Sequence, residues 1–332
     1  MEKKNVLVIG ANGQIGSELV LALMNEFNVI ASDLPINGVS NNSNLQDEIK
    51  NKGLKFIDLD VTNVIAVEEA VKEFQVNQVY LLAAMVSGVA ERKRVPSWNL
   101  NVGGLLNILE ISLNNGIEKV YWPSSMAVYG PVDGKQLKVA QQTDPLFPVS
   151  IYGAAKVAGE QLCYYYANRK GLDVRSIRYP GLISTKTPGG GGTTDYAIDI
   201  FFSANKNEKF ECFLKEDTRM EMMYMDDAIN GTIQLMKYPK EKLTPGISYN
   251  LGAVDFTPCE IYEEIKKHKP SFEIIYNPDE ENRQKNANSW PAKINDEKAS
   301  QDWEWKPKYN SKELLTEIML KNAYRTEKLM SE

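Results

Sequence analysis

The N-terminal segment of the chain constrains its fold more than any other part. Residues 5–16, NVLVIGANGQIG, begin with a short apolar run rich in β-branched side chains and end in a turn with glycine at every third position. An apolar pattern of helical spacing follows over 17–27, and a second strand-like run ends at Asp33. A buried strand, a glycine turn, a helix and a strand that ends in an acid predict a dinucleotide-binding unit.

Each part of this unit has a chemical purpose. The glycines Gly10 and Gly13 allow backbone amides to approach a pyrophosphate, and the following helix directs its positive end at the same charge. Gly16 lets that helix pack closely on the strand. Asp33 can accept hydrogen bonds from both ribose hydroxyls and would repel a 2′-phosphate. The sequence therefore predicts NAD as cofactor, rather than NADP.

Strand-like and helical runs continue to alternate after Asp33. Further strands are predicted within residues 54–61, 78–84, 119–125 and 173–181. This alternation predicts an α/β fold with a doubly wound parallel sheet, whose ligands bind at the carboxyl ends of the strands. We expect residues 1–180 to form the NAD-binding domain. Residues 181–332 should form mainly a smaller substrate-binding domain, with some segments that return to the sheet.

Composition excludes several other classes of protein. The formal net charge of −6 argues against a nucleic-acid partner, and no apolar run approaches the roughly 20 residues of a membrane span. The three cysteines are widely spaced, and the single histidine, His268, is expected at the end of an amphipathic helix. We therefore expect a cytoplasmic protein without a disulfide framework, a metal site or a membrane partner.

A second group of residues predicts the chemistry. Tyr152 and Lys156 are four residues apart at the start of a predicted helix, so both side chains share one helix face. A lysine ammonium beside a tyrosine favours the phenolate, and we expect the pKa of Tyr152 to fall below its usual value near 10. Such a tyrosine can take a proton from an alcohol, which Ser125, at the end of a predicted strand, can hold in place.

Together these motifs resemble the extended short-chain dehydrogenase/reductase family. The resemblance consists of G-x-x-G-x-x-G at residues 10–16, a strand-end serine before V-Y-G at 128–130, and Y-x-x-x-K at 152–156. It implies that Ser125, Tyr152 and Lys156 are catalytic. The cofactor-binding residues that we predict are Gly10, Asn12, Gly13, Gln14, Ile15, Gly16, Asp33, Asp60, Val61, Leu82, Ala83, Ala84, Asn101, Tyr152, Lys156, Tyr179, Pro180 and Leu182.

The second half of the chain resembles one branch of this family, the short-chain L-threonine 3-dehydrogenases. Its runs TPGGGGTTDY (187–196) and DTRMEMMYMDDA (217–228) are similar to family motifs, except for Gly189 and for Met220-Glu221, where the family has proline and Leu-Pro. The resemblance implies oxidation of L-threonine at C3, and a homodimer formed through the Tyr152 helix. The predicted substrate residues are Ser87, Ser125, Tyr152, Thr193, Thr194, Asp195 and Trp290.

The four glycines at 189–192 permit more than one role. A phosphate-binding P-loop requires G-K-[ST] after its glycines, whereas here Thr193 and Thr194 follow directly. We predict that residues 187–195 form a hinge that closes over the substrate, with a threonine or Asp195 as the cap of the next helix. A purely structural turn is the alternative. For the whole chain, the alternatives are a nucleotide-sugar 4-epimerase or dehydratase of the same fold, and a non-catalytic NAD-sensing regulator.

Overall fold

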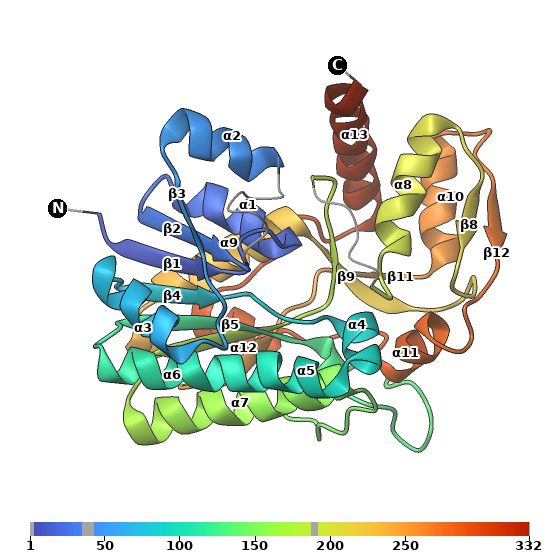
Figure 1. The fold of residues 1–332 in the computed structure, drawn as a ribbon. Helices are drawn as coiled ribbons and strands as arrows, with labels where there is room; N and C mark the ends of the chain where they lie inside the picture. The colour runs from blue at the N-terminus through green and yellow to red at the C-terminus, as the bar shows by residue number, and fades with distance from the viewer. Residues whose placement is uncertain (1–2, 35–42, 187–191, 332) are drawn as a thin grey trace.

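The computed structural model describes residues 3–34, 43–186 and 192–331 (Figure 1). Within these residues the main sheet has seven strands, all parallel, in the order β10-β6-β5-β4-β1-β2-β3. The strands are β1 (Asn5–Ile9), β2 (Asn28–Asp33), β3 (Lys55–Asp58), β4 (Gln78–Leu81), β5 (Lys119–Ser125), β6 (Val174–Tyr179) and β10 (Ser248–Asn250). The predicted doubly wound α/β fold is confirmed.

Helices cover both faces of this sheet (Figure 1). One face packs against α1 (Gln14–Leu23), α2 (Ser43–Lys52), α9 (Met225–Lys237) and α12 (Glu297–Trp303), and the other against α3 (Val64–Glu73), α6 (Gly104–Asn114) and α7 (Ile151–Lys170). Strand β1 shows why both faces are apolar. Val6 and Val8 face the first group, whereas Leu7 and Ile9 face the second, because strand side chains alternate.

The second half of the chain adds smaller sheets beside the main one. Strand β9 (Met220–Tyr224) pairs in parallel with β7 (Gly181–Ile183) and antiparallel with β11 (Val254–Phe256), and β8 (Phe210–Cys212) pairs in parallel with β12 (Ile274–Tyr276). A separate apolar core joins these strands to α8 (Tyr196–Lys206), α10 (Pro258–His268), α11 (Arg283–Ser289) and α13 (Lys312–Ser331). Strand β10, although it comes from this half, joins the main sheet beside β6.

Short helices complete the chain, and one predicted helix end is confirmed. They are α4 (Ser87–Arg92), α5 (Arg94–Trp98), the π-helix η1 (Asn99–Gly103), and the 3₁₀-helices η2 (Met126–Val128) and η3 (Lys240–Lys242). His268 ends α10, as its sequence context predicted. Trp303 and Trp305 are buried against the main sheet. Among the described residues, no helix is both long enough and apolar enough to cross a bilayer.

Glu221, at one of the positions where the chain departs from the family motif, joins three segments of the second half. It lies on β9 and is only 2% exposed. Its Oε1 accepts a hydrogen bond of 2.8 Å from the amide of Ala253, and its Oε2 accepts one of 3.1 Å from the amide of Ile294. Burial raises the pKa of Glu221 to about 7, although these two hydrogen bonds act in the opposite direction.

The raised pKa of Glu221 predicts how stability depends on pH. Because the folded protein binds this proton more tightly than the unfolded chain, the free energy of unfolding falls as pH rises from the ordinary glutamate pKa to about 7. Glu221 contributes at most about 1.4 kcal/mol per pH unit to this decrease in the free energy of unfolding. In Glu221→Gln this component of the slope should disappear. Urea unfolding at several pH values between 5 and 7.5 measures it, and identical slopes in both proteins would contradict the assignment.

Candidate active site

A cleft of about 350 Å³ opens at the carboxyl ends of the main-sheet strands. It brings together most of the predicted site residues, namely Gly10, Gly13, Gln14, Ile15, Gly16, Leu82, Ala84, Ser87, Ser125, Tyr152, Lys156, Tyr179, Pro180, Leu182, Thr193, Thr194, Asp195 and Trp290. It is also lined by Gly181 and Gly192, which lie inside predicted segments, and by residues that the sequence analysis missed: Val86, Pro123, Ser124 and Met126. Each of these lies within two positions of a predicted residue, and this proximity is the signal that could have found them.

The glycine turn between β1 and α1 leaves no room for side chains. Gly10 has a φ of +92°, and a Cβ there would lie 2.5 Å from the backbone nitrogen of Ala83. A Cβ at Gly16 would lie 2.1 Å from the carbonyl oxygen of Gly10. Gly13 is the N-cap residue of α1 and has no side chain to cover the amides of its first turn. The turn is therefore a bare helix N-terminus suited to a phosphate.

Asp33 stands at the end of β2 next to this turn. Its Oδ2 accepts a hydrogen bond of 2.8 Å from the amide of Asn12, and its Oδ1 accepts one of 2.8 Å from the amide of Leu34. These bonds fix the carboxylate beside the glycine turn, where an adenosine ribose would lie if the pyrophosphate meets the helix N-terminus. The glycines, the open helix end and the fixed acid all fit a bound NAD.

Six predicted cofactor residues do not line the cleft: Asn12, Asp33, Asp60, Val61, Ala83 and Asn101. Some of them shape the backbone around it. Asn101, in the π-helix η1, donates to the carbonyl oxygen of Met85 at 3.0 Å and accepts from its amide at 2.9 Å, which fixes the loop after β4. Asp60 accepts hydrogen bonds from the amide and hydroxyl of Thr62 and so closes a local turn.

Helix α7 presents Tyr152 and Lys156 to the end of β5. The Nζ of Lys156 donates a 2.6 Å hydrogen bond to the carbonyl oxygen of Pro123 and lies 4.4 Å from the ring centroid of Trp122. It also lies 5.5 Å from the ring centroid of Tyr152. Ser125 lines the same cleft, and its hydroxyl acts to lower the pKa of Tyr152. The three predicted catalytic side chains are thus gathered at one point of the cleft.

The pKa of Tyr152 differs from the expectation. Burial raises it to about 12, and only the hydrogen bond with Ser125 acts to lower it. Burial also lowers the pKa of Lys156 to about 7. The predicted fall in the pKa of Tyr152 is therefore wrong for this structure. The reason is that desolvation penalises both charged forms, whereas the sequence argument considered only their mutual attraction.

The described part of the predicted hinge, residues 192–195, forms a tight turn before α8. Asp195 occupies the N-cap position of α8, one of the expected alternatives, but its side chain does not cap the helix. Its Oδ2 instead accepts a 2.8 Å hydrogen bond from the amide of Gly192. Thr193 is 2% exposed, and the methyl group of Thr194 packs against Gly181. Residues 187–191, with three of the four glycines, lie outside the described residues.

Trp290 closes another side of the cleft. It follows α11 directly, is 7% exposed and packs into the apolar core of the second half. Tyr179, by contrast, directs its hydroxyl to the hydroxyls of Tyr121, at 2.6 Å, and Thr232. Core packing thus holds Trp290 in place, and hydrogen bonds hold Tyr179.

Comparisons with known proteins agree with this geometry. Residues 6–252 match the NAD dependent epimerase/dehydratase family. An uncharacterized epimerase/dehydratase of Staphylococcus haemolyticus is 40% identical over 321 residues, which cover 96% of this chain and 97% of that protein. Among solved structures, the holo form of a GalE-like L-threonine dehydrogenase from Cupriavidus necator is similar, with a TM-score of 0.88, 44% identity, and coverage of 96% and 99% of the two chains.

The L-threonine dehydrogenase from Clostridium difficile is also similar. Its TM-score is 0.89 with 38% identity, and the match covers 98% of this chain and 99% of that chain. Both the family match and the relatives extend over the glycine turn, the Tyr152 helix and the strands that form the cleft. The chain is therefore an enzyme of the NAD-dependent epimerase/dehydratase family, and its cofactor is NAD.

Proposed function

We propose that this chain is an NAD-dependent L-threonine 3-dehydrogenase that oxidises the C3 hydroxyl of L-threonine to give 2-amino-3-ketobutyrate. The observation that carries the proposal is its similarity, over the whole chain and therefore over the substrate half as well, to solved L-threonine dehydrogenases at 38% and 44% identity. The assembled serine, tyrosine and lysine favour an enzyme over a non-catalytic regulator, which would need none of them.

Residues of the first half would hold the cofactor. The glycine turn and the N-terminus of α1 would bind the pyrophosphate, and Asp33 the adenosine ribose. Lys156, beside Tyr152 on α7, would bind the nicotinamide ribose, and the segment from Tyr179 to Leu182 would lie against the nicotinamide. When bound, NAD accepts the hydride from C3 of the substrate. Residues 181–332 would mainly hold the substrate.

Tyr152 would remove the proton of the C3 hydroxyl. Ser125 and Tyr152 line the same cleft, so a substrate alcohol bound by the Ser125 hydroxyl would lie beside the phenolic oxygen. Because burial raises the pKa of Tyr152, the phenolate needs a positive charge close by. The ammonium of Lys156, 5.5 Å from the tyrosine ring, supplies that charge. Tyr152 is thus the general base, and Lys156 stabilises its anion.

Replacement of the base tests this reaction directly. Tyr152→Phe keeps the ring and the fold but removes the proton acceptor, so turnover of L-threonine should fall by roughly 10²–10⁴. NAD affinity, measured by fluorescence titration, should stay the same. NADH absorbance with L-threonine measures the rate, and chromatography of UDP-galactose incubated in parallel detects isomerisation, which releases no net NADH. A near-normal rate in the variant would contradict the role of Tyr152. If UDP-galactose is isomerised while L-threonine is ignored, the chain is an epimerase.

We propose that the turn at 192–195 contributes polar contacts to the substrate. Thr193 is nearly buried yet lines the cleft, so Thr193→Val should lower kcat/KM for L-threonine roughly 5- to 150-fold while NAD affinity and Tm hold. Thr316, fully buried on α13, offers a matched control: Thr316→Val should leave kcat/KM unchanged. Normal kinetics in the Thr193 variant would contradict the proposed substrate contacts and leave the turn with a purely structural role.

We propose further that two copies pair through the Tyr152 helix, in a cytoplasmic enzyme. Large apolar side chains are exposed on α5, α6 and α7: Val95 70%, Trp98 41%, Leu106 40%, Tyr164 52% and Tyr165 46%. Exposed apolar side chains on neighbouring helices favour association. Light scattering should therefore give twice the 37.4 kDa chain mass, and Leu106→Glu should lower it. A native protein of monomer mass would contradict the dimer.

A further inference from the structure

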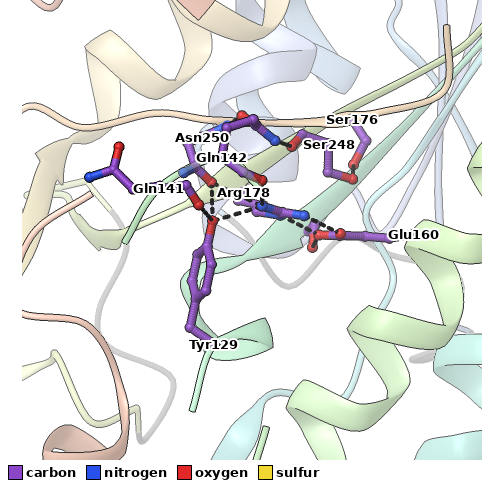
Figure 2. Close-up of polar contacts among 9 residues, drawn as sticks. Tyr129, Gln141, Gln142, Glu160, Ser176, Arg178, Ser248 and Asn250 are labelled. Atoms are coloured by element: carbon purple, nitrogen blue, oxygen red, sulfur yellow. Dashed lines mark hydrogen bonds and ion pairs between the residues drawn. The ribbon is translucent and has the colours of Figure 1, made fainter. Parts of the chain in front are cut away.

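A buried ion pair joins Glu160 to Arg178 (Figure 2). Glu160 is one helical turn beyond Lys156 on α7 and is 5% exposed, and Arg178 on β6 is 6% exposed. Arg178 donates from Nε to Oε1 of Glu160 at 2.8 Å and from Nη2 to Oε2 at 2.7 Å. The two guanidinium bonds form a bidentate pair, a geometry that holds the carboxylate in one position and stabilises its charge.

The same carboxylate reaches the end of β5. Ser124 donates a 2.5 Å hydrogen bond to Oε1 of Glu160, and Lys156 donates to the carbonyl oxygen of the preceding residue, Pro123. Two residues one turn apart on α7 therefore bind two consecutive residues of β5. The next residue of that strand is Ser125. Glu160 thus helps to set the position of Ser125 relative to the helix that carries Tyr152.

Arg178 is in turn held from its other side (Figure 2). Its Nη1 donates to the hydroxyl of Tyr129 at 2.7 Å, to the carbonyl oxygen of Gln142 at 3.1 Å and to Oδ1 of Asn250 at 3.3 Å. These partners come from the loop after β5 and from β10. The buried guanidinium is therefore well supplied with acceptors, and Glu160 cannot move without disturbing several elements.

Glu160 also acts on the charge of Lys156. Burial lowers the pKa of Lys156, and Cys163 and Glu160 are the groups that raise it. Burial raises the pKa of Cys163, so its thiol stays neutral and Glu160 supplies the negative charge. The other titratable groups that face this cluster are Tyr152 on α7, Arg178 on β6, and Tyr129 after β5.

We propose that Glu160 is a positioning residue of this active site: fixed by Arg178, its carboxylate holds the Ser124–Ser125 end of β5 against α7 and keeps the ammonium of Lys156 charged. The inference rests on the proposed function, because Lys156 and Tyr152 act in that reaction. Its first test, however, uses the protein without substrate or cofactor.

That test follows the protonation of Lys156 by NMR on protein labelled with ¹⁵N-lysine, with the signal assigned by its loss in Lys156→Met. Since Glu160→Gln alone would leave a buried, unpaired Arg178, the double variant Glu160→Gln/Arg178→Gln is measured beside it, and both are checked by circular dichroism. In folded Glu160→Gln the Lys156 titration should move to lower pH by about one unit. In the double variant it should move by less, because the loss of the Arg178 charge acts in the opposite direction. An unchanged titration in every variant that folds would overturn the proposal.

The chain offers a matched control at the amino end of the same strand. Arg175 binds Asp173 in the same bidentate manner, at 2.8 and 2.7 Å. Asp173→Asn should leave the Lys156 titration where it is in the native protein, because four residues of extended strand separate Asp173 from Arg178. A shift as large as that in the Glu160 variants would mean that any disturbance of β6 affects Lys156, and the proposal would be wrong.

Kinetics provide the second measurement. If Lys156 must be charged, kcat/KM for L-threonine should begin to decline at a lower pH in the double variant than in the native enzyme. Where the declining parts of the two pH profiles are one unit apart, kcat/KM of the variant should be about tenfold below that of the native enzyme. A profile of native shape would overturn the catalytic consequence. The two hypotheses fail separately: a native protein that does not oxidise L-threonine refutes the proposed function, whereas an unmoved Lys156 titration refutes the role of Glu160.

Discussion

The buried ammonium of Lys156 is the constraint on which the active site depends. A charge removed from water is costly unless the protein surrounds it with partners, and burial lowers the pKa of Lys156 to about 7 even with the groups that raise it. The carbonyl oxygen of Pro123, the ring of Trp122 and the charge of Glu160 offset that cost. These contacts require α7 and the end of β5 to lie in one fixed register, and the same register brings Tyr152 to Ser125.

The parallel sheet makes this arrangement possible. Its strands end at one edge, so the glycine turn after β1, the loop after β4 and the serines of β5 open into a single cleft. The second half closes the cleft with the turn at 192–195 and with Trp290. It is attached to the main sheet by β10, which pairs with β6 directly beside the Arg178 network. The two halves of the chain are thereby joined through buried polar contacts.

Local patterns made much of this predictable from sequence. The first strands and helices have clear periodicity. Short sequence motifs were enough to recognise the glycine turn, Asp33 and the pair of Tyr152 and Lys156. The short strands β7, β8, β10, β11 and β12 have only three residues each, too few for a periodic signal, so their pairing was not predictable. The pKa of Tyr152 and the turn made by Asp195 depend on burial and on tertiary contacts, which a linear sequence does not contain.

The central claim is that this cleft transfers a hydride from C3 of L-threonine. The most direct measurement uses L-threonine deuterated at C3 and analyses the reduced cofactor by mass spectrometry. The account predicts NADH that carries one deuterium, together with a slower rate than with unlabelled L-threonine if hydride transfer limits turnover. Reduced cofactor without deuterium, or no reduced cofactor at all from a protein that binds NAD normally, would contradict the account.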